Sequence, residues 1–227
     1  MALLSGTHFL TPTVPVHVFQ GARPGDTVII QAGIHGDEVA GVHALCELLE
    51  ANIRPVAGKL IITPIMNAPA YRARQRAAPD GLDLNRCFPG DPEGDAHEHR
   101  LAHAFMELIK AESPALVATL HESHKRYDPA VNPSFGQTLV YGVDPMPPVV
   151  GRVVDRLNAS VQSEEEEWAT QFFPVATSST EVIVDAVGCV GICVETWMGF
   201  PEARRVQMQI EVVRLLMDEF GVLPMGA

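Results

Sequence analysis

The sequence predicts an α/β fold in which a mixed, mostly parallel sheet is flanked by helices. Two observations lead to this prediction. Short apolar runs rich in Val and Ile are typical of buried strands. Between them, apolar residues recur every three or four positions, as they do on amphipathic helices. We expect the 227 residues to form a single domain, residues 1–227, because no internal repeat or long linker divides them.

The predicted strands and helices alternate along the chain. The strands are residues 27–32, 59–65, 115–120, 137–142 and 190–194. The helical stripes are Val39, Val42, Leu45 and Leu49; Leu101, Phe105 and Leu108; Val150, Val153, Val154 and Leu157; and Val206, Ile210, Val213, Met217 and Phe220. Residues 67–95 carry several prolines and arginines but no apolar period. We expect a long functional loop there, because ordinary connections have about 4 to 6 residues.

Composition and charge exclude several classes of protein. Hydrophobic residues make up 47% and charged residues 19%, which excludes a disordered, collagen-like or coiled-coil chain. The net charge of −12 disfavours binding to nucleic acid or to an anionic membrane surface. The chain has no long apolar run and no signal-like start, so we expect a cytoplasmic protein. The four cysteines are scattered and are expected to be free thiols.

Titratable side chains follow three of the predicted strands. His35 and Glu38 come after the strand at 27–32, His121 follows 115–120, and Glu195 follows 190–194. In open α/β sheets, ligands bind beyond the carboxyl ends of the strands. We therefore expect these side chains to meet at one edge of the sheet, together with arginines from the long loop.

The residue types at this edge predict a zinc site. The pair His35 and Glu38 is a weak signal by itself, because H-x-x-E is common. With His121 it forms a His2Glu set, which catalytic zinc uses when a fourth position stays open for water. Glu195 is the remaining carboxylate at the strand ends and is the candidate base.

Four successive motifs resemble those of the succinylglutamate desuccinylase/aspartoacylase family, a branch of the zinc metallocarboxypeptidase-like amidohydrolases. The motifs are His35-Gly-Asp-Glu38, Asp83-Leu84-Asn85-Arg86 followed by Phe88-Pro89-Gly90, Leu120-His121, and Val194-Glu195-Thr196. The likeness spans residues 27–197, and the ordered set is more specific than any one motif. The resemblance implies a zinc carboxypeptidase-like fold and a hydrolase that cleaves an amide bond in a small carboxylate-bearing substrate.

The resemblance also implies roles for individual residues. His35, Glu38 and His121 would bind one Zn²⁺ ion. Glu195 would activate the zinc-bound water and later pass a proton to the leaving amine. Asn85 and Arg86 match the pair that grips a substrate carboxylate. Arg76 best matches the arginine that polarises the scissile carbonyl, with Arg72 and Arg74 as alternatives.

The chain departs from the family pattern at three places. Asp37 stands where many relatives have Asn, and it could lie beside the metal ligands or cap the following helix. The sequence ends soon after the helix at 202–220, so we expect the C-terminal β domain of aspartoacylases to be absent. The segment after His121 is unusual as well; His124 and Arg126 either shape specificity or are ordinary exposed residues.

Several alternatives stay open. An N-acyl amino acid deacylase is the leading function, and a metallocarboxypeptidase or peptide amidase acting on short peptides would use the same centre. A non-catalytic binding module of the same fold is a rival. A cysteine hydrolase through Cys193 lacks an identifiable histidine partner. His99 and His103 could hold a metal on a helix face, although an exposed polar face is the simpler interpretation. An oligomer is possible but not indicated.

Overall fold

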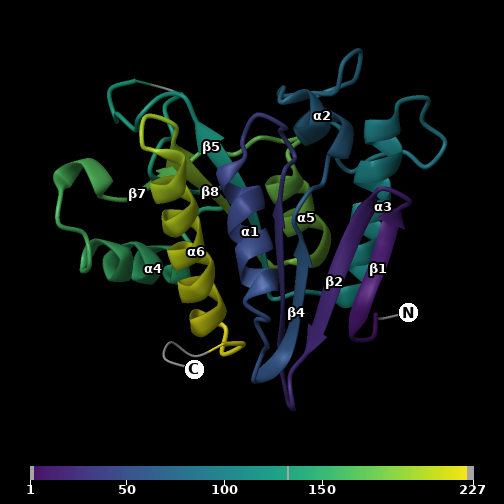
Figure 1. The fold of residues 1–227 in the computed structure, drawn as a ribbon, viewed down its shortest axis with the longest axis horizontal. Helices are drawn as coiled ribbons and strands as arrows, with labels where there is room; N and C mark the ends of the chain where they lie inside the picture. Colours follow the sequence, from purple (N-terminus) through teal and green to yellow (C-terminus); the bar gives the residue numbers. More distant parts are fainter. Residues whose placement is uncertain (1–2, 132, 224–227) are drawn as a thin grey trace.

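The computed structural model describes residues 3–131 and 133–223 and is built around one eight-stranded sheet, with strand order β1-β2-β4-β3-β5-β8-β6-β7 (Figure 1). The strands are β1 (Gly6–Thr11), β2 (Val14–Gln20), β3 (Arg23–Ala32), β4 (Ala57–Thr63), β5 (Leu116–Ser123), β6 (Thr138–Tyr141), β7 (Ala169–Phe172) and β8 (Val190–Trp197). The central strands β4, β3, β5 and β8 pair in parallel, whereas β1, β2 and β4, and also β8 and β6, pair antiparallel. The predicted mixed sheet is confirmed.

Helices cover both faces of the sheet, as predicted. They are α1 (Ala40–Glu50), α2 (Ala68–Ala73), α3 (His97–Glu112), α4 (Pro148–Asn158), α5 (Ser179–Val187) and α6 (Glu202–Glu219). Along β3, Val28 and Ile30 join the apolar core under α1, α4 and α6, while Ile29 joins the core under α3 and α5. Because successive side chains of a strand point to opposite faces, a central strand buried on both faces reads as a continuous apolar run.

Two strands extend further than the sequence predicts. The prediction ended them at Leu120 and Val194, but the parallel ladder between β5 and β8 continues to Ser123 and Trp197. His121 and Glu195 therefore lie inside paired strands, directly opposite each other in the register, and not in the loops that follow. Polar residues end the apolar run without ending the backbone pairing, so the prediction was short by a few residues.

The short and peripheral elements have no counterpart in the sequence prediction. Strands β1 and β7 form the two edges of the sheet, and many of their side chains are exposed or half-buried. Strand β2 alternates buried Val14, Val16 and Val18 with half-buried residues, a period-2 pattern that was overlooked. Residues 67–95 are mostly irregular, as predicted, but they contain α2 and a short 3-10 turn, Leu84–Arg86.

Within residues 3–131 and 133–223, no helix is both long enough and apolar enough to cross a membrane.

The loop between β3 and α1 lies against the backbone of α2. The Gly36 amide donates to the Gln75 carbonyl oxygen at 2.9 Å. A Cβ atom at Gly36 would lie 2.0 Å from the carbonyl carbon and oxygen of Ala70. Only a residue without a side chain allows this approach, which holds the loop against the arginine-rich segment.

This contact predicts that Gly36→Ala destabilises the protein. The added methyl group would collide with backbone atoms, so we expect the free energy of unfolding to fall by about 1 to 3 kcal/mol. The matched control is Gly151→Ala in α4, where a Cβ would make only an ordinary 3.4 Å contact with Met146. That control is expected to be neutral or to stabilise by up to about 1 kcal/mol. Urea titration would measure both, and equal midpoints for Gly36→Ala and the parent would contradict the prediction.

Candidate metal and active site

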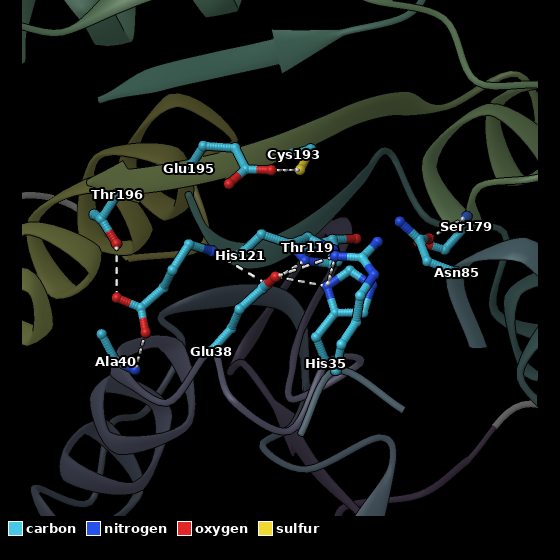
Figure 2. Close-up of polar contacts among 12 residues, drawn as sticks. His35, Glu38, Ala40, Asn85, Thr119, His121, Ser179, Cys193, Glu195 and Thr196 are labelled. Atoms are coloured by element: carbon cyan, nitrogen blue, oxygen red, sulfur yellow. Dashed lines mark hydrogen bonds and ion pairs between the residues drawn. The ribbon is translucent and has the colours of Figure 1, made fainter. Parts of the chain in front are cut away.

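The residues His35, Glu38 and His121 converge at the carboxyl ends of the central strands. All three are buried, and one donor atom from each lies within 4.8 Å of the others. The Glu38 carboxylate contacts His35 Nδ1 with one oxygen and His121 Nδ1 with the other, both at 2.7 Å. Figure 2 shows the three side chains pointing toward one another, with Glu195 on the neighbouring strand. The structure thus brings together the ligand set that the sequence predicted.

A tight turn delivers His35 and Glu38 from the end of β3. Gly33 has φ +66°, a left-handed conformation that glycine adopts without steric strain. The carbonyl oxygens of Ala32 and Gly33 accept hydrogen bonds from Met66 N at 3.0 Å and Asn67 N at 2.8 Å. These bonds tie the turn to the start of the long loop. The third residue, His121, comes from β5 itself.

Neighbouring polar groups hold each of the three side chains in place. Asp83 Oδ1 lies 3.2 Å from His35 Nε2. The Glu122 amide donates to Glu38 Oε2 at 3.1 Å, and Gln209 Nε2 donates to the His121 carbonyl oxygen at 2.8 Å. Partners of this kind orient the ring and carboxylate of metal ligands.

The charges of the cluster are strongly coupled. Burial opposes a charge on His35, but Glu38 and Asp83 outweigh it and raise the pKa of His35 to about 9. Burial likewise opposes the Glu38 charge, but the two imidazoles hold its pKa well below its usual range. For His121, burial prevails and lowers the pKa. The Glu38 charge therefore acts on both imidazoles, and it outweighs the effect of burial at His35 but not at His121.

Glu195 faces the cluster from β8 and has an unused oxygen. Burial and the nearby Glu38 charge raise the pKa of Glu195 to about 8. Its Oε2 atom is buried and has no hydrogen-bond partner among residues 3–131 and 133–223. A buried carboxylate oxygen without a partner is costly unless something else satisfies it.

These observations fit a divalent cation. The donor set is two imidazoles and a carboxylate, the combination that zinc accepts with a fourth position open. A cation held by His35, Glu38 and His121 would also supply positive charge close to the orphaned oxygen of Glu195. The residues present are therefore suited to the predicted metal.

Cys193 is poorly suited to be a nucleophile. Burial raises the pKa of its thiol well above the usual range, and Glu195 adds to that effect. Its Sγ atom donates toward Glu195 Oε1 at 3.6 Å. Because the thiolate is the reactive form, the structure argues against a cysteine hydrolase.

Of the three candidate arginines, Arg76 is the one that lines the pocket. Its guanidinium contacts Asp83 Oδ2 through Nη2 at 3.0 Å and lies 3.8 Å from Glu38 Oε1 through Nη1. Arg74 instead stacks over the Tyr71 ring at 4.7 Å. Asp83, for which the sequence suggested no role, therefore holds both Arg76 and His35.

The predicted carboxylate-binding pair also lines the pocket. Asn85 Oδ1 accepts hydrogen bonds from the Ser179 amide at 3.0 Å and hydroxyl at 3.2 Å, at the start of α5. These bonds fix the amide so that its Nδ2 group is the part left to donate to a ligand. Arg86 is exposed beside it, with its Nη1 bonded to the Asn85 carbonyl oxygen at 2.9 Å.

The pocket is a cavity of about 360 Å³ with polar and apolar lining residues. The cluster, Glu195 and Arg76 line it, and so do residues of β6, α5 and the segments before them. The apolar lining residues are Pro133, Phe135, Val140, Tyr141, Phe173 and Val175. Tyr141 also packs against the apolar core, so it serves both the core and the pocket. The size suits a small ligand.

Of the remaining predicted residues, Asp37 and His124 line the pocket and Arg126 does not. Asp37 lines it and has a buried Oδ1 atom without a partner in the described part of the chain, but it does not cap α1. His124 is exposed at the pocket, whereas Arg126 turns away, bonding the Glu164 carbonyl oxygen at 2.9 Å. His99 and His103 belong to no group of three donors close enough for an ion within residues 3–131 and 133–223.

A buried ion pair that the sequence does not predict, Glu122 with Arg205, lies next to the cluster. The Glu122 carboxylate accepts from the Ala40 amide at 2.9 Å and so caps α1, the role considered for Asp37. It also contacts Arg205 of α6 and Thr196 of β8. Burial raises the pKa of Glu122. No local sequence pattern indicates this ion pair, because its two residues are 83 positions apart.

The comparison with known proteins agrees with this geometry. Residues 24–128 match the family model described as the succinylglutamate desuccinylase/aspartoacylase catalytic domain. The N-alpha-acetyl-L-2,4-diaminobutyric acid deacetylase of Halomonas elongata is 39% identical over 118 residues. That match covers 51% of this chain and 33% of the relative, so the chain spans about a third of the relative's length.

Solved structures share the fold over most of this chain. The product-bound ectoine utilization protein EutE (DoeB) of Ruegeria pomeroyi is 25% identical, with a TM-score of 0.70, over 92% of this chain and 61% of that chain. The tripeptide-bound cell shape determinant Csd4 of Helicobacter pylori is 18% identical, with a TM-score of 0.81, over 92% and 56% of the two chains. The second likeness concerns the fold alone.

The buried ion pair predicts a large effect of Arg205→Met. The variant would leave the Glu122 carboxylate, with 0% side-chain exposure, without its cationic partner, so we expect a loss of about 3 kcal/mol in the free energy of unfolding. The matched control is Arg152→Met, whose exposed side chain pairs with Glu219 and whose loss is expected to stay below about 1 kcal/mol. Chemical denaturation would measure both losses. Similar losses in the two variants would contradict a special contribution of the buried Glu122–Arg205 pair to stability.

Proposed function

Because residues 24–128 match the catalytic-domain model of the succinylglutamate desuccinylase/aspartoacylase family, we propose that the chain is a zinc-dependent hydrolase that removes the acyl group from an N-acylated amino acid. The observation that carries this proposal is the convergence of His35, Glu38 and His121 beside the orphaned carboxylate oxygen of Glu195. The small pocket with a carboxylate-binding pair supports a small anionic substrate.

Zinc held by His35, Glu38 and His121 would act as a Lewis acid toward the amide carbonyl and increase the acidity of water. The other roles belong to this chain's own side chains. Glu195 takes a proton from the attacking water and returns it to the leaving amine, a task suited to a buried carboxylate that faces the cluster with an unpaired oxygen.

Two further groups orient the substrate and stabilise the developing charge. Arg76 lies half-exposed beside the cluster, where its guanidinium can donate to the scissile carbonyl oxygen as negative charge grows on it. Asn85 Nδ2 and Arg86 hold the carboxylate of the amino acid through planar, charge-assisted hydrogen bonds. Together they place the amide bond between the cluster and Glu195.

The metal site is tested by metal content. The purified protein should bind about one equivalent of Zn²⁺, and His35→Ala and His121→Ala should each bind far less, because each removes one of three ligands. The control is His103→Ala, which removes one of the two histidines considered as metal ligands on a helix face; this variant should keep its zinc. Elemental analysis after dialysis measures this. Full zinc content in both ligand variants would disprove the site.

The base is tested by Glu195→Gln in an assay of amine release. Removing the proton carrier should lower kcat by at least about 10² to 10⁴-fold while zinc content stays unchanged. The substrates are N-acetyl and N-succinyl amino acids beside short peptides with free C-termini, and chelator-treated protein is the control. Unchanged turnover in Glu195→Gln would contradict the proposed mechanism. Turnover confined to peptides would instead identify the protein as a carboxypeptidase or peptide amidase.

A further inference from the structure

One carboxylate in the pocket has no place in the reaction described above. Glu181 lies in the first turn of α5, where its amide donates to the Ser178 hydroxyl at 3.3 Å. Its half-buried side chain lines the same pocket as the metal cluster. The start of α5 therefore supplies an acidic group to the wall of the pocket.

Gly142 makes room for this carboxylate. A Cβ atom at position 142 would lie 1.2 Å from Glu181 Oε1, so any side chain there would occupy the place of the carboxylate. The φ angle of Gly142 is not in the left-handed region, so the backbone itself does not demand glycine. Gly142, directly after β6, leaves open the space in which the Glu181 carboxylate lies.

The Glu181 carboxylate lacks a cationic partner in the described part of the chain. None of the ion pairs or side-chain hydrogen bonds within residues 3–131 and 133–223 includes its oxygens. The charged residue that influences it is Asp185, one turn further along α5; burial and this like charge raise the pKa of Glu181. A half-buried carboxylate beside another acid is stabilised by any cation that reaches it.

The position of Glu181 relates it to the carboxylate-binding pair. Asn85 is bonded to Ser179, two residues before Glu181 in the same helical turn. Because an α-helix rises about 1.5 Å per residue, the backbones of Ser179 and Glu181 are separated by about 3 Å along the helix axis. A ligand whose carboxylate rests on Asn85 and Arg86 can therefore reach Glu181 with an ordinary amino-acid side chain.

We propose that Glu181, seated over Gly142, is a specificity determinant that binds an ammonium group on the side chain of the substrate. The substrate class is then an N-acylated diamino acid: one carboxylate for Asn85 and Arg86, one amide for the cluster, and one cation for Glu181. This inference rests on the proposed function and narrows it. Lys125, an exposed cation that also lines the pocket, would favour a substrate with a second carboxylate instead, and the experiment below separates the two.

The test compares three substrates that differ at the side-chain end: Nα-acetyl-L-ornithine, the neutral Nα-acetyl-L-norvaline and the anionic Nα-acetyl-L-glutamate. We expect kcat/KM for the ornithine derivative to exceed that for the norvaline derivative by at least about tenfold. Glu181→Gln should remove most of this preference, and so should Gly142→Ala, which displaces the carboxylate without deleting it. Asp185→Asn, an exposed acid on the same helix, is the control and should keep the preference.

Two outcomes would overturn the inference: an unchanged ratio in Glu181→Gln, or a preference of the parent protein for the glutamate derivative. If the parent hydrolyses none of the three, the proposed function fails, and calorimetry then decides the inference separately. Zinc-loaded protein should bind L-ornithine more tightly than L-norvaline, and the difference should vanish in Glu181→Gln. Equal affinities of the parent protein for the two amino acids would overturn it.

Discussion

The buried carboxylate of Glu38, with an imidazole 2.7 Å from each oxygen, is the interaction on which the rest of the site depends. His35, Glu38 and His121 are all almost fully buried, and removing charged groups from water costs several kcal/mol for each ion unless partners compensate. The compensation comes from distant elements: Asp83 from the long loop, and the Glu122 amide from β5. The charges of the site are therefore stabilised by residues from several elements that meet at this edge of the sheet.

This constraint explains features of the fold that seem unrelated to chemistry. The extended ladder between β5 and β8 sets His121 beside Glu195, so the register of two strands places the base next to a ligand. The last long helix, α6, reaches the same place, because Arg205 pairs with the carboxylate that caps α1 and Gln209 holds the backbone of His121. Helix packing and site geometry are thus linked through one buried network.

Within the pocket, the groups suited to bond cleavage and the groups suited to substrate recognition come from different elements. The groups suited to bond cleavage lie on or beside the central strands, where parallel pairing and burial keep them rigid. The groups suited to recognition gather at the start of α5, which fixes Asn85 through Ser179 and presents Glu181 over Gly142. Because Asn85 and Glu181 lie off the central strands, substitutions at these two positions can alter substrate choice without replacing a group of the reaction centre.

The sequence by itself determined the fold class, the central strands, the long amphipathic helices and the residues that meet as His35, Glu38, His121 and Glu195. It could do so because buried parallel strands are continuous apolar runs and their carboxyl ends share one edge. It did not reveal the edge strands or α5, which are short or half-exposed. The tertiary structure placed Arg76, the arginine that the family resemblance already favoured, in the pocket, and it revealed the Glu122–Arg205 pair and the position of Glu181 over Gly142. Each of these depends on a contact between side chains or backbone brought together by folding, and a local pattern of residues carries no information about such a distance.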